Sequence, residues 1–484
     1  MRKPLPLLAM MTMLCACGSG ADAPVDAGPG DAQVADSGPA DVGSDTSAQT
    51  DAAKPFTKPT PFAVALSGTG PDQLQSVTAG PNGTFYAAGF VATTAAGPKL
   101  VTVVKLTTTG LDPSFGAGGV AKTAIEFAGG AGEIDLAVQP SGKIVVSATV
   151  ANAIATADRD VAVFRLDATG ALDATFGDAG VRVIDFNTAL DASQSAQRDA
   201  ARGIALGPGG VIYVSAVQRG LLARTDSDYG VAKLTVDGAV DATFASGGKF
   251  SLDFGTPSAN ATARGIRALP GGGVIVAGYA SSSISGNTTQ PVLFKLTSGG
   301  ALDSAFGDNG IFHAPVLTLQ TEAYAVALHG GSLVTGGYGR NTGTTNDWVS
   351  LRFDATTGVR DTKWGNAPNG AVLFDPSGKA LGSACRNAIG LPGGKTLLLG
   401  STGPSNTTTQ DAVFAVLDAN GVLDTSYGTG VQVFPLGSGE GGSDQFWSGA
   451  VSGTNVLVVG FRGAGTTQTD QLNDDAYAVA FPLQ

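Results

Sequence analysis

The chain has 484 residues, of which 43% are hydrophobic and only 14% are charged, and its formal net charge is −12. This acidic balance argues against binding to nucleic acid and against docking on anionic lipid through a basic patch. The 71 glycines favour many short strands joined by tight turns over a helical protein.

Residues 1–16 are expected to form a lipoprotein signal peptide. Two basic residues at 2–3 precede an apolar run over residues 5–14 that is too short to span a bilayer. The sequence LCAC at residues 14–17 resembles the bacterial lipobox. This resemblance implies cleavage before Cys17 and acylation of Cys17, which would anchor the protein to a membrane. An ordinary secretory signal without lipid is the alternative.

Residues 17–60 are expected to comprise the lipidated cysteine and a disordered tether. Alanine, aspartate, proline and glycine dominate this segment, so it cannot bury enough apolar surface to offset its chain entropy. Its aspartates repel one another and extend it. Because Cys17 is followed by glycine rather than aspartate, the expected location is the bacterial cell envelope, at the outer membrane.

From residue 61 onward, the phrase Leu-Asp-x-x-Phe-Gly returns every 58 to 68 residues. A unit of this length holds four short strands with their turns, which is one blade of a β-propeller. The six copies read LDPSFG (111–116), LDATFG (172–177), VDATFA (240–245), LDSAFG (302–307), RDTKWG (360–365) and LDTSYG (423–428).

The second repeat shows the expected strands most clearly. Strands are predicted over residues 133–138, 143–149, 160–166 and 181–186, because these runs are rich in β-branched residues or alternate in period two. Gln-Pro-Ser-Gly forms the first turn, and the repeated phrase lies in the long turn before the fourth strand.

The repeat count predicts how the domain over residues 61–484 closes. Six units end in the repeated phrase, and a seventh unit begins near Asp444 but contains only three strands. The segment 61–67 would supply the missing strand. We therefore expect an all-β fold, a seven-bladed β-propeller of four-stranded antiparallel blades, closed by pairing of the N-terminal strand with the last blade. An open solenoid is the alternative.

These units resemble the bacterial delta-60 repeat, a family of β-propeller-like units. The resemblance rests on the repeated phrase, on a Pro-x-Gly turn before an aliphatic strand, and on an aspartate near the start of the third strand at Asp160, Asp228, Asp347, Asp411 and Asp475. The chain departs from the pattern at Lys99, Ala245, Gln290, residues 360–364 and Tyr427. The resemblance implies a propeller fold and no established enzymatic activity.

The residues of the repeated phrase are predicted to have a structural role. Each aspartate is expected to accept hydrogen bonds from backbone N–H groups of its turn, while each aromatic side chain fills the core between blades. A ring of carboxylate ligands is the alternative. The residues are Asp112, Phe115, Asp173, Phe176, Asp241, Phe244, Asp303, Phe306, Asp361, Trp364, Asp424 and Tyr427.

The sequence predicts no metal site, no cofactor and no catalytic residue. Acidic groups at 158–160, 226–228 and 473–475 lack the alternating ligands and central glycine of a calcium loop. The two histidines, His313 and His329, have no zinc-type spacing. Cys385 is the only cysteine in residues 61–484, and we expect it to be a buried apolar residue.

Long polar connections between second and third strands are predicted on one rim of the propeller. Such variable loops on a repeated scaffold commonly carry binding specificity, although they could simply keep the surface soluble. They span residues 151–158, 218–226, 281–290, 339–346, 403–410 and 463–473.

The expected function is that of a lipid-anchored binding or scaffold module for a protein or glycan partner, and not an enzyme. One alternative is a propeller-type carbohydrate-active enzyme, a lyase or hydrolase, and another is a purely structural surface lipoprotein. The lining of the central channel discriminates between them. Converging unlike acids, arginines and tyrosines would favour an enzyme, and small apolar residues would favour a scaffold.

Overall fold

The computed structural model describes residues 55–66, 70–129, 132–153, 158–186, 199–219, 226–254, 260–281, 288–403, 410–436, 443–463 and 475–484. These residues belong to one compact unit, residues 53–484. Residues 1–16 and Cys17 lie outside the described residues, as does most of the expected tether, so the signal peptide and lipid attachment stay predictions.

Regular structure in the described residues is β-strand, with short 3-10 turns and no α-helix. This agrees with the all-β prediction from the glycine-rich repeats. No helix in this part of the chain could span a membrane. The 3-10 turns are Pro81–Gly83, Pro208–Gly210, Trp364–Asn366, Pro368–Gly370, Pro392–Gly394 and Thr425–Tyr427.

The strands form antiparallel sheets in which consecutive strands pair in chain order. The first sheet contains β2 (Asp72–Ala79), β3 (Phe85–Val91), β4 (Leu100–Leu106) and β5 (Val120–Glu126). The second contains β6 (Asp135–Val138), β7 (Ile144–Ala151), β8 (Arg159–Leu166) and β9 (Val181–Ile184). The third contains β10 (Ala200–Leu206), β11 (Ile212–Arg219), β12 (Ser227–Leu234) and β13 (Lys249–Leu252).

The next two repeats form one nine-stranded sheet, because a single parallel pair, Thr289 with Gln320, joins them. The first repeat supplies β14 (Ala261–Ala268), β15 (Val274–Ser281), β16 (Thr289–Leu296) and β17 (Ile311–His313). The second supplies β18 (Gln320–His329), β19 (Ser332–Arg340), β20 (Asp347–Ser350), β21 (Arg352–Asp354) and β22 (Val372–Phe374). Both β20 and β21 pair with β19, so they occupy the place of one interrupted third strand.

The last two sheets are four-stranded. One contains β23 (Ser383–Gly390), β24 (Thr396–Thr402), β25 (Asp411–Leu417) and β26 (Val431–Phe434). The other contains β27 (Gln445–Ser452), β28 (Asn455–Arg462), β29 (Asp475–Pro482) and β1 (Phe62–Ala63). Here β1 pairs antiparallel with β29, with Phe62 opposite Ala478, and the backbone N–H of Val64 donates to the oxygen of Ala476 at 2.9 Å.

Residues 55–60, which the sequence analysis assigned to the tether, contact the last two sheets. The ring of Phe56 lies 5.7 Å from that of Tyr427 and 6.2 Å from that of Phe481. The Nζ of Lys58 donates to the backbone oxygen of Val433 at 2.6 Å. The aromatic ring of Phe56 therefore extends the folded unit toward the N-terminus, in a segment whose overall composition resembles a linker.

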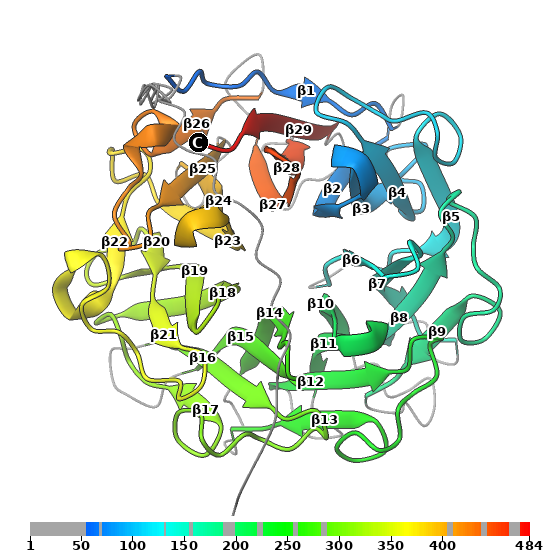
Figure 1. Ribbon diagram of the computed structural model, residues 1–484, viewed down its shortest axis with the longest axis horizontal. Helices are drawn as coiled ribbons and strands as arrows, with labels where there is room; N and C mark the ends of the chain where they lie inside the picture. Colours follow the sequence, from blue (N-terminus) through cyan, green and yellow to red (C-terminus); the bar gives the residue numbers. More distant parts are fainter. Residues whose placement is uncertain are drawn as a thin grey trace, which may run out of the picture. The chain divides into compact units, whose positions relative to one another are not determined.

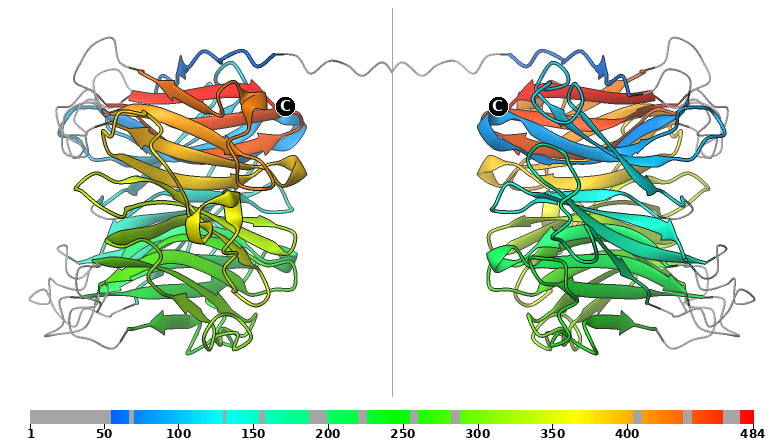
Figure 2. Two further views of the ribbon diagram at one scale, coloured as in Figure 1. Left: turned by 90° about the vertical axis from the view of Figure 1, so that its left-hand side faces the viewer. Right: turned by 90° about the vertical axis from the view of Figure 1, so that its right-hand side faces the viewer.

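The sheets follow one another in chain order around a central axis, with β2, β6, β10, β14, β18, β23 and β27 nearest to it (Figure 1). In side view, the strand axes of successive sheets are roughly aligned with one another (Figure 2). Apolar clusters join neighbouring sheets. For example, Phe115, in the turn between β4 and β5, packs in one cluster with Leu136 of the second sheet. Leu74 of the first sheet packs with Leu457 of the last.

The aspartate of each repeated phrase stabilises its own turn. Asp173 Oδ1 accepts a hydrogen bond from the Thr175 backbone N–H at 3.1 Å, and Asp173 Oδ2 pairs with Arg165 Nε at 2.8 Å. All six aspartates accept such a bond from the N–H two residues later. All six also pair with a basic side chain: Lys105, Arg165, Lys233, Lys295, Arg352 or Lys395.

The aromatic residue of each phrase is fully or almost fully buried. In five repeats, its ring lies against a glycine in the corresponding turn of the next repeat; the pairs are Phe115–Gly170, Phe176–Gly238, Phe244–Gly300, Phe306–Gly358 and Trp364–Gly421. A backbone hydrogen bond accompanies each contact, as from the Gly177 N–H to the Asp237 oxygen at 2.9 Å. The sixth ring, Tyr427, packs instead on Phe56 and Phe481.

Replacing Gly238 by alanine tests how much this inter-sheet contact stabilises the fold. A Cβ at Gly238 would lie 2.6 Å from a ring carbon of Phe176, whereas a Cβ at Gly142 would meet nothing within 4 Å, and both glycines have a φ of +82°. Both variants should lose about 1–2 kcal/mol from the positive φ. Gly238→Ala should lose about 1–3 kcal/mol more from overpacking.

The free energies of unfolding of the two variants, measured by chemical denaturation, give this difference directly. Equal losses for Gly238→Ala and Gly142→Ala would show that the contact with Phe176 contributes nothing specific.

Candidate ligand site in the central cavity

Most of the innermost strands carry a β-bulge in their N-terminal half. In six of them the register of pairing shifts by one residue, which leaves Gln75, Arg202, Arg264, Tyr324, Arg386 and Trp447 as the extra residues. A bulge locally disrupts the ladder and re-aims a side chain. All six side chains line a cavity of about 560 Å³ between the inner strands.

Glu133, two residues before the start of β6, is the acceptor at the centre of this group. Its Oε1 accepts hydrogen bonds from Arg202 Nη1 at 2.8 Å, from Arg264 Nη1 at 3.3 Å and from the Tyr324 hydroxyl at 3.3 Å. Arg386 Nη1 donates to the Tyr324 hydroxyl at 3.0 Å. These residues come from five different repeats, so only the assembled sheets bring them together.

Aromatic rings hold two of the arginines by stacking. The Arg264 guanidinium lies 4.2 Å from the ring centre of Tyr324 and 5.4 Å from that of Tyr279. The Arg386 guanidinium lies 5.0 Å from Tyr324 and 5.7 Å from Trp447. Such cation–π contacts orient a planar guanidinium while leaving its edge available for hydrogen bonds.

Several buried donors at this site have no hydrogen-bond partner within the described residues. They are the Nε atoms of Arg202, Arg264 and Arg386 and the Nε1 of Trp447. Leaving a buried donor unsatisfied costs about 1–3 kcal/mol, so four such donors around one cavity need a reason. Burial, with the adjacent Arg264 charge, lowers the pKa of Arg202, which a bound anion would reverse.

The arrangement is suited to an anion with planar oxygens. Three guanidinium groups face one cavity with Glu133 as the only carboxylate that pairs with them in the described part of the chain. The guanidinium fork matches a carboxylate bidentately, and Tyr324 and Trp447 add apolar surface beside it. The cavity volume is within the range of about 300–1,000 Å³ typical of small-molecule sites.

Asp135 fixes the inner strands around this site. Its carboxylate accepts hydrogen bonds from the Ser76 hydroxyl of the first sheet and from the Ile204 backbone N–H of the third, the latter at 2.9 Å. Burial raises the pKa of Asp135, and Arg267 opposes that shift. The side chain therefore links three sheets and is already occupied by their groups.

The residues that the sequence singled out lie away from this cavity. The six aspartates of the repeated phrase are each engaged in their own turn, and the structure does not bring them together. Cys385 is fully buried, which raises the pKa of its thiol to about 12. His313 lies against the ring of Phe254, and His329 shares a hydrogen bond with the Thr396 hydroxyl at 2.9 Å.

The long polar connections are only partly within the described residues. The connection at residues 339–346 is fully described, and in it Arg340 Nη1 donates to the Asn346 side-chain oxygen at 2.8 Å. Most of the other five lies outside the described residues. The predicted binding rim thus stays a prediction.

The pattern that the repeats share does not include the cavity residues. Alignment of the inner strands places Gln75, Ile134, Arg202, Arg264, Tyr324, Arg386 and Trp447 in one column. The neighbouring positions are small or apolar in most repeats. A column of large, unlike residues was therefore the sequence signal that could have revealed the cavity. Unlike residues at equivalent positions of a repeat are what an asymmetric ligand site needs.

Comparison with known proteins supports the fold. A family described as "Domain of unknown function (DUF5122) beta-propeller" matches residues 139–176 and 272–306. These segments are equivalent parts of the second and fourth repeats, and each ends in the repeated phrase. No curated protein sequence matches the chain significantly.

The solved structures that match this chain share little sequence with it. The polysaccharide lyase Uly1 is 11% identical, with a TM-score of 0.48, and the match covers 91% of this chain and 94% of that one. The β-propeller domain of the Trilobed protease from Pyrococcus furiosus, which has an open velcro topology, is 10% identical, with a TM-score of 0.41 and coverages of 86% and 98%. A Hadza microbial sialidase is 12% identical, with a TM-score of 0.39 and coverages of 88% and 95%.

The matched segments carry the second and third strands of two repeats, and those strands belong to antiparallel sheets that pair in chain order. Together, the family match and this sheet topology identify the described unit as a β-propeller protein.

Proposed function

We propose that the unit is a seven-bladed propeller of delta-60 type, closed where the first and last blades meet. The Val77 backbone N–H of the first blade donates to the Ser448 hydroxyl of the last at 3.2 Å. This repeats the contact between the first two blades, in which the Leu136 N–H donates to the Ser76 hydroxyl at 3.4 Å. The Ala476 N–H also donates to Asp72 at 2.7 Å.

Chains shortened at the N-terminus test the closure. A chain starting at residue 61 keeps β1 and should fold with a modest loss of stability, because it lacks only the contacts of Phe56 and Lys58. A chain starting at residue 70 exposes the edge of β29 and removes the buried Val64 and Leu66, so it should unfold several degrees lower or aggregate. Equal melting temperatures of both chains would contradict closure by β1.

We propose that the propeller is a binding module whose central cavity holds a small ligand with a carboxylate group, such as an acidic sugar. The observation that carries this proposal is the set of unpaired Nε donors on Arg202, Arg264 and Arg386 around one cavity. A carboxylate would accept from these donors and neutralise the excess positive charge. The aromatic faces of Tyr324 and Trp447 would contact the sugar ring.

Arg386 gives the sharpest variant for this proposal. Unlike Arg202 and Arg264, it forms no ion pair with a carboxylate of the described residues, so Arg386→Gln strands no partner such as Glu133. Hydrogen bonds to charged groups contribute about 1.5–3 kcal/mol, so the variant should weaken binding of glucuronate roughly 10- to 100-fold. Isothermal titration calorimetry on the full chain measures the change.

Two controls complete this experiment. Arg182 lies away from the cavity, where its Nη1 pairs with Asp178 Oδ2 at 2.8 Å. Arg182→Gln should therefore leave binding unchanged. Glucose, which lacks the carboxylate, should bind the wild-type chain at least tenfold more weakly than glucuronate. Equal affinity of the wild-type chain for both sugars would contradict recognition through the arginines.

An enzyme acting on the same ligand is the second candidate. The lining of the cavity favours it, because an acid, a tyrosine and arginines converge there, as the sequence analysis required for an enzyme. The Glu133 carboxylate and the Tyr324 hydroxyl are also in hydrogen-bond contact, so they can exchange a proton beside a bound substrate. Cleavage of acidic polysaccharides by the wild-type chain, lost in Glu133→Gln but retained in Arg182→Gln, would support this candidate. Tight binding without turnover would favour the binding module.

We propose that Cys17 carries the lipid that holds this module at the outer membrane. The support is the lipobox-like sequence at residues 14–17 and the two basic residues before the apolar run. In a bacterial host fed an alkyne-labelled fatty acid, the wild-type chain and Cys15→Ser should incorporate the label, whereas Cys17→Ser should not. Label in Cys17→Ser equal to that of the wild type would place the modification elsewhere.

A further inference from the structure

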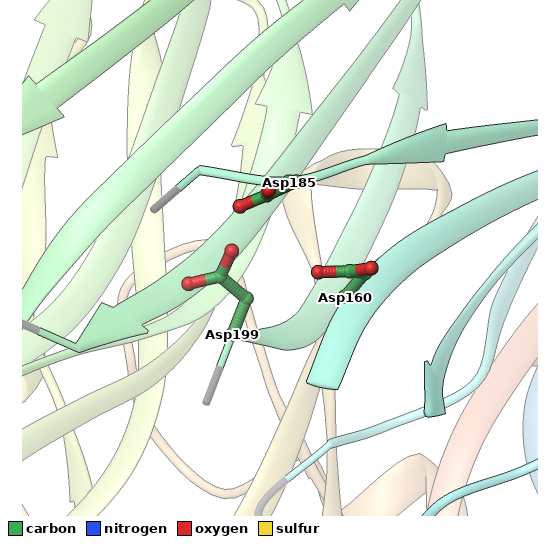
Figure 3. Close-up of side chains that lie close together, drawn as sticks. All are labelled: Asp160, Asp185 and Asp199. Atoms are coloured by element: carbon green, nitrogen blue, oxygen red, sulfur yellow. The ribbon is translucent and has the colours of Figure 1, made fainter. Parts of the chain in front are cut away.

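Three aspartates meet where the second sheet joins the third. Asp160 lies in β8, Asp185 directly follows β9 and Asp199 directly precedes β10 (Figure 3). One carboxylate oxygen from each lies within 4.8 Å of the others. Asp160 is 4% exposed and Asp199 is 1% exposed, so two of the three carboxylates are removed from water.

The described residues donate hydrogen bonds to only some of the oxygens of these three carboxylates. Asn152 Nδ2 donates to Asp160 Oδ2 at 2.9 Å, and the Phe186 N–H donates to Asp199 Oδ2 at 2.7 Å. The Oδ1 atoms of Asp160, Asp185 and Asp199 are buried and have no hydrogen-bond partner among the described residues. Each carboxylate thus keeps one oxygen for the space that the three share.

The described residues supply no positive charge to these carboxylates. No ion pair with a described lysine or arginine reaches any of the three, and Lys249 donates to the backbone oxygen of Asp185 at 2.7 Å instead. Burial, with the charges of nearby aspartates, raises the pKa of Asp199 to about 8. Buried like charges are strongly unfavourable unless a counter-charge compensates them.

We propose that Asp160, Asp185 and Asp199 bind one calcium ion, which fastens the second sheet to the third. Calcium takes six to eight oxygen ligands at about 2.3–2.6 Å, so two oxygens on one ion lie at most about 5.2 Å apart. The observed limit of 4.8 Å satisfies this condition. The site contains no histidine or cysteine, which disfavours zinc and copper, and backbone oxygens or water would complete the shell.

The next junction carries a related group that serves as an internal comparison. Asp228 in β12 and Asp253 after β13 correspond to Asp160 and Asp185, and with Asp226 they also lie within 4.8 Å of one another. The position of Asp199 is occupied there by Asn260, directly before β14. This junction, between the third sheet and β14, therefore lacks the carboxylate that would come from the following sheet.

The experiment compares Asp199→Asn with wild type in the full chain, with EGTA and with calcium chloride. Asparagine still accepts a hydrogen bond from the Phe186 N–H, but it removes one charge. Calcium should raise the melting temperature of the wild type by on the order of 2–4 °C. In Asp199→Asn this shift should shrink to less than half.

The sign of the difference in melting temperature between Asp199→Asn and the wild type distinguishes a cation site from an aspartate with a purely structural role. In EGTA, Asp199→Asn should melt at or above the wild-type temperature, because it removes a buried carboxyl group that has no counter-charge there. In calcium it should melt below the wild-type temperature. Asp411→Asn, which changes the first residue of β25, should keep the full calcium shift. Absence of a shift in the wild type, or an equal shift in Asp199→Asn, would overturn the proposal, as would an equal response to sodium chloride at matched ionic strength.

Discussion

The structure depends on the contact that five of its repeats make with the repeat that follows. An aromatic ring from one turn rests on a glycine of the next turn, and a backbone hydrogen bond fixes the distance between them. Because this glycine has a positive φ and no Cβ, the ring can approach the backbone closely. The aspartate of the same phrase holds the turn through its own N–H bond and basic partner, so one short phrase sets both the turn and its neighbour.

A repeated scaffold gives function through the positions at which its repeats differ. The bulge in the inner strand recurs in six repeats and directs one side chain toward the central cavity each time. Three repeats place arginine there, and others place glutamine, tyrosine and tryptophan. The regular backbone thus presents an irregular set of donors, which is how a symmetric fold can recognise an asymmetric ligand.

Two places in the structure bury side chains whose charges are not balanced by described residues. At the central cavity, arginines exceed the carboxylates that they pair with; at the junction of the second and third sheets, carboxylates face one another without a basic partner among the described residues. Both imbalances are buried, where water cannot screen them. The anion proposed for the first and the cation proposed for the second follow from the same requirement that buried charge be compensated.

The sequence by itself determined the all-β class, the repeat boundaries and the strands, because alternation, turn residues and the repeated phrase are local signals. It also indicated the role of the repeated aspartates, since an aspartate two residues before its N–H donor is a short-range pattern. Glu133, Arg264 and Tyr324 are separated by more than 50 residues each, and Asp160, Asp185 and Asp199 come from three separate segments. Only the tertiary structure decided those groupings, because packing of successive sheets brings their strand ends together and no local spacing encodes that proximity.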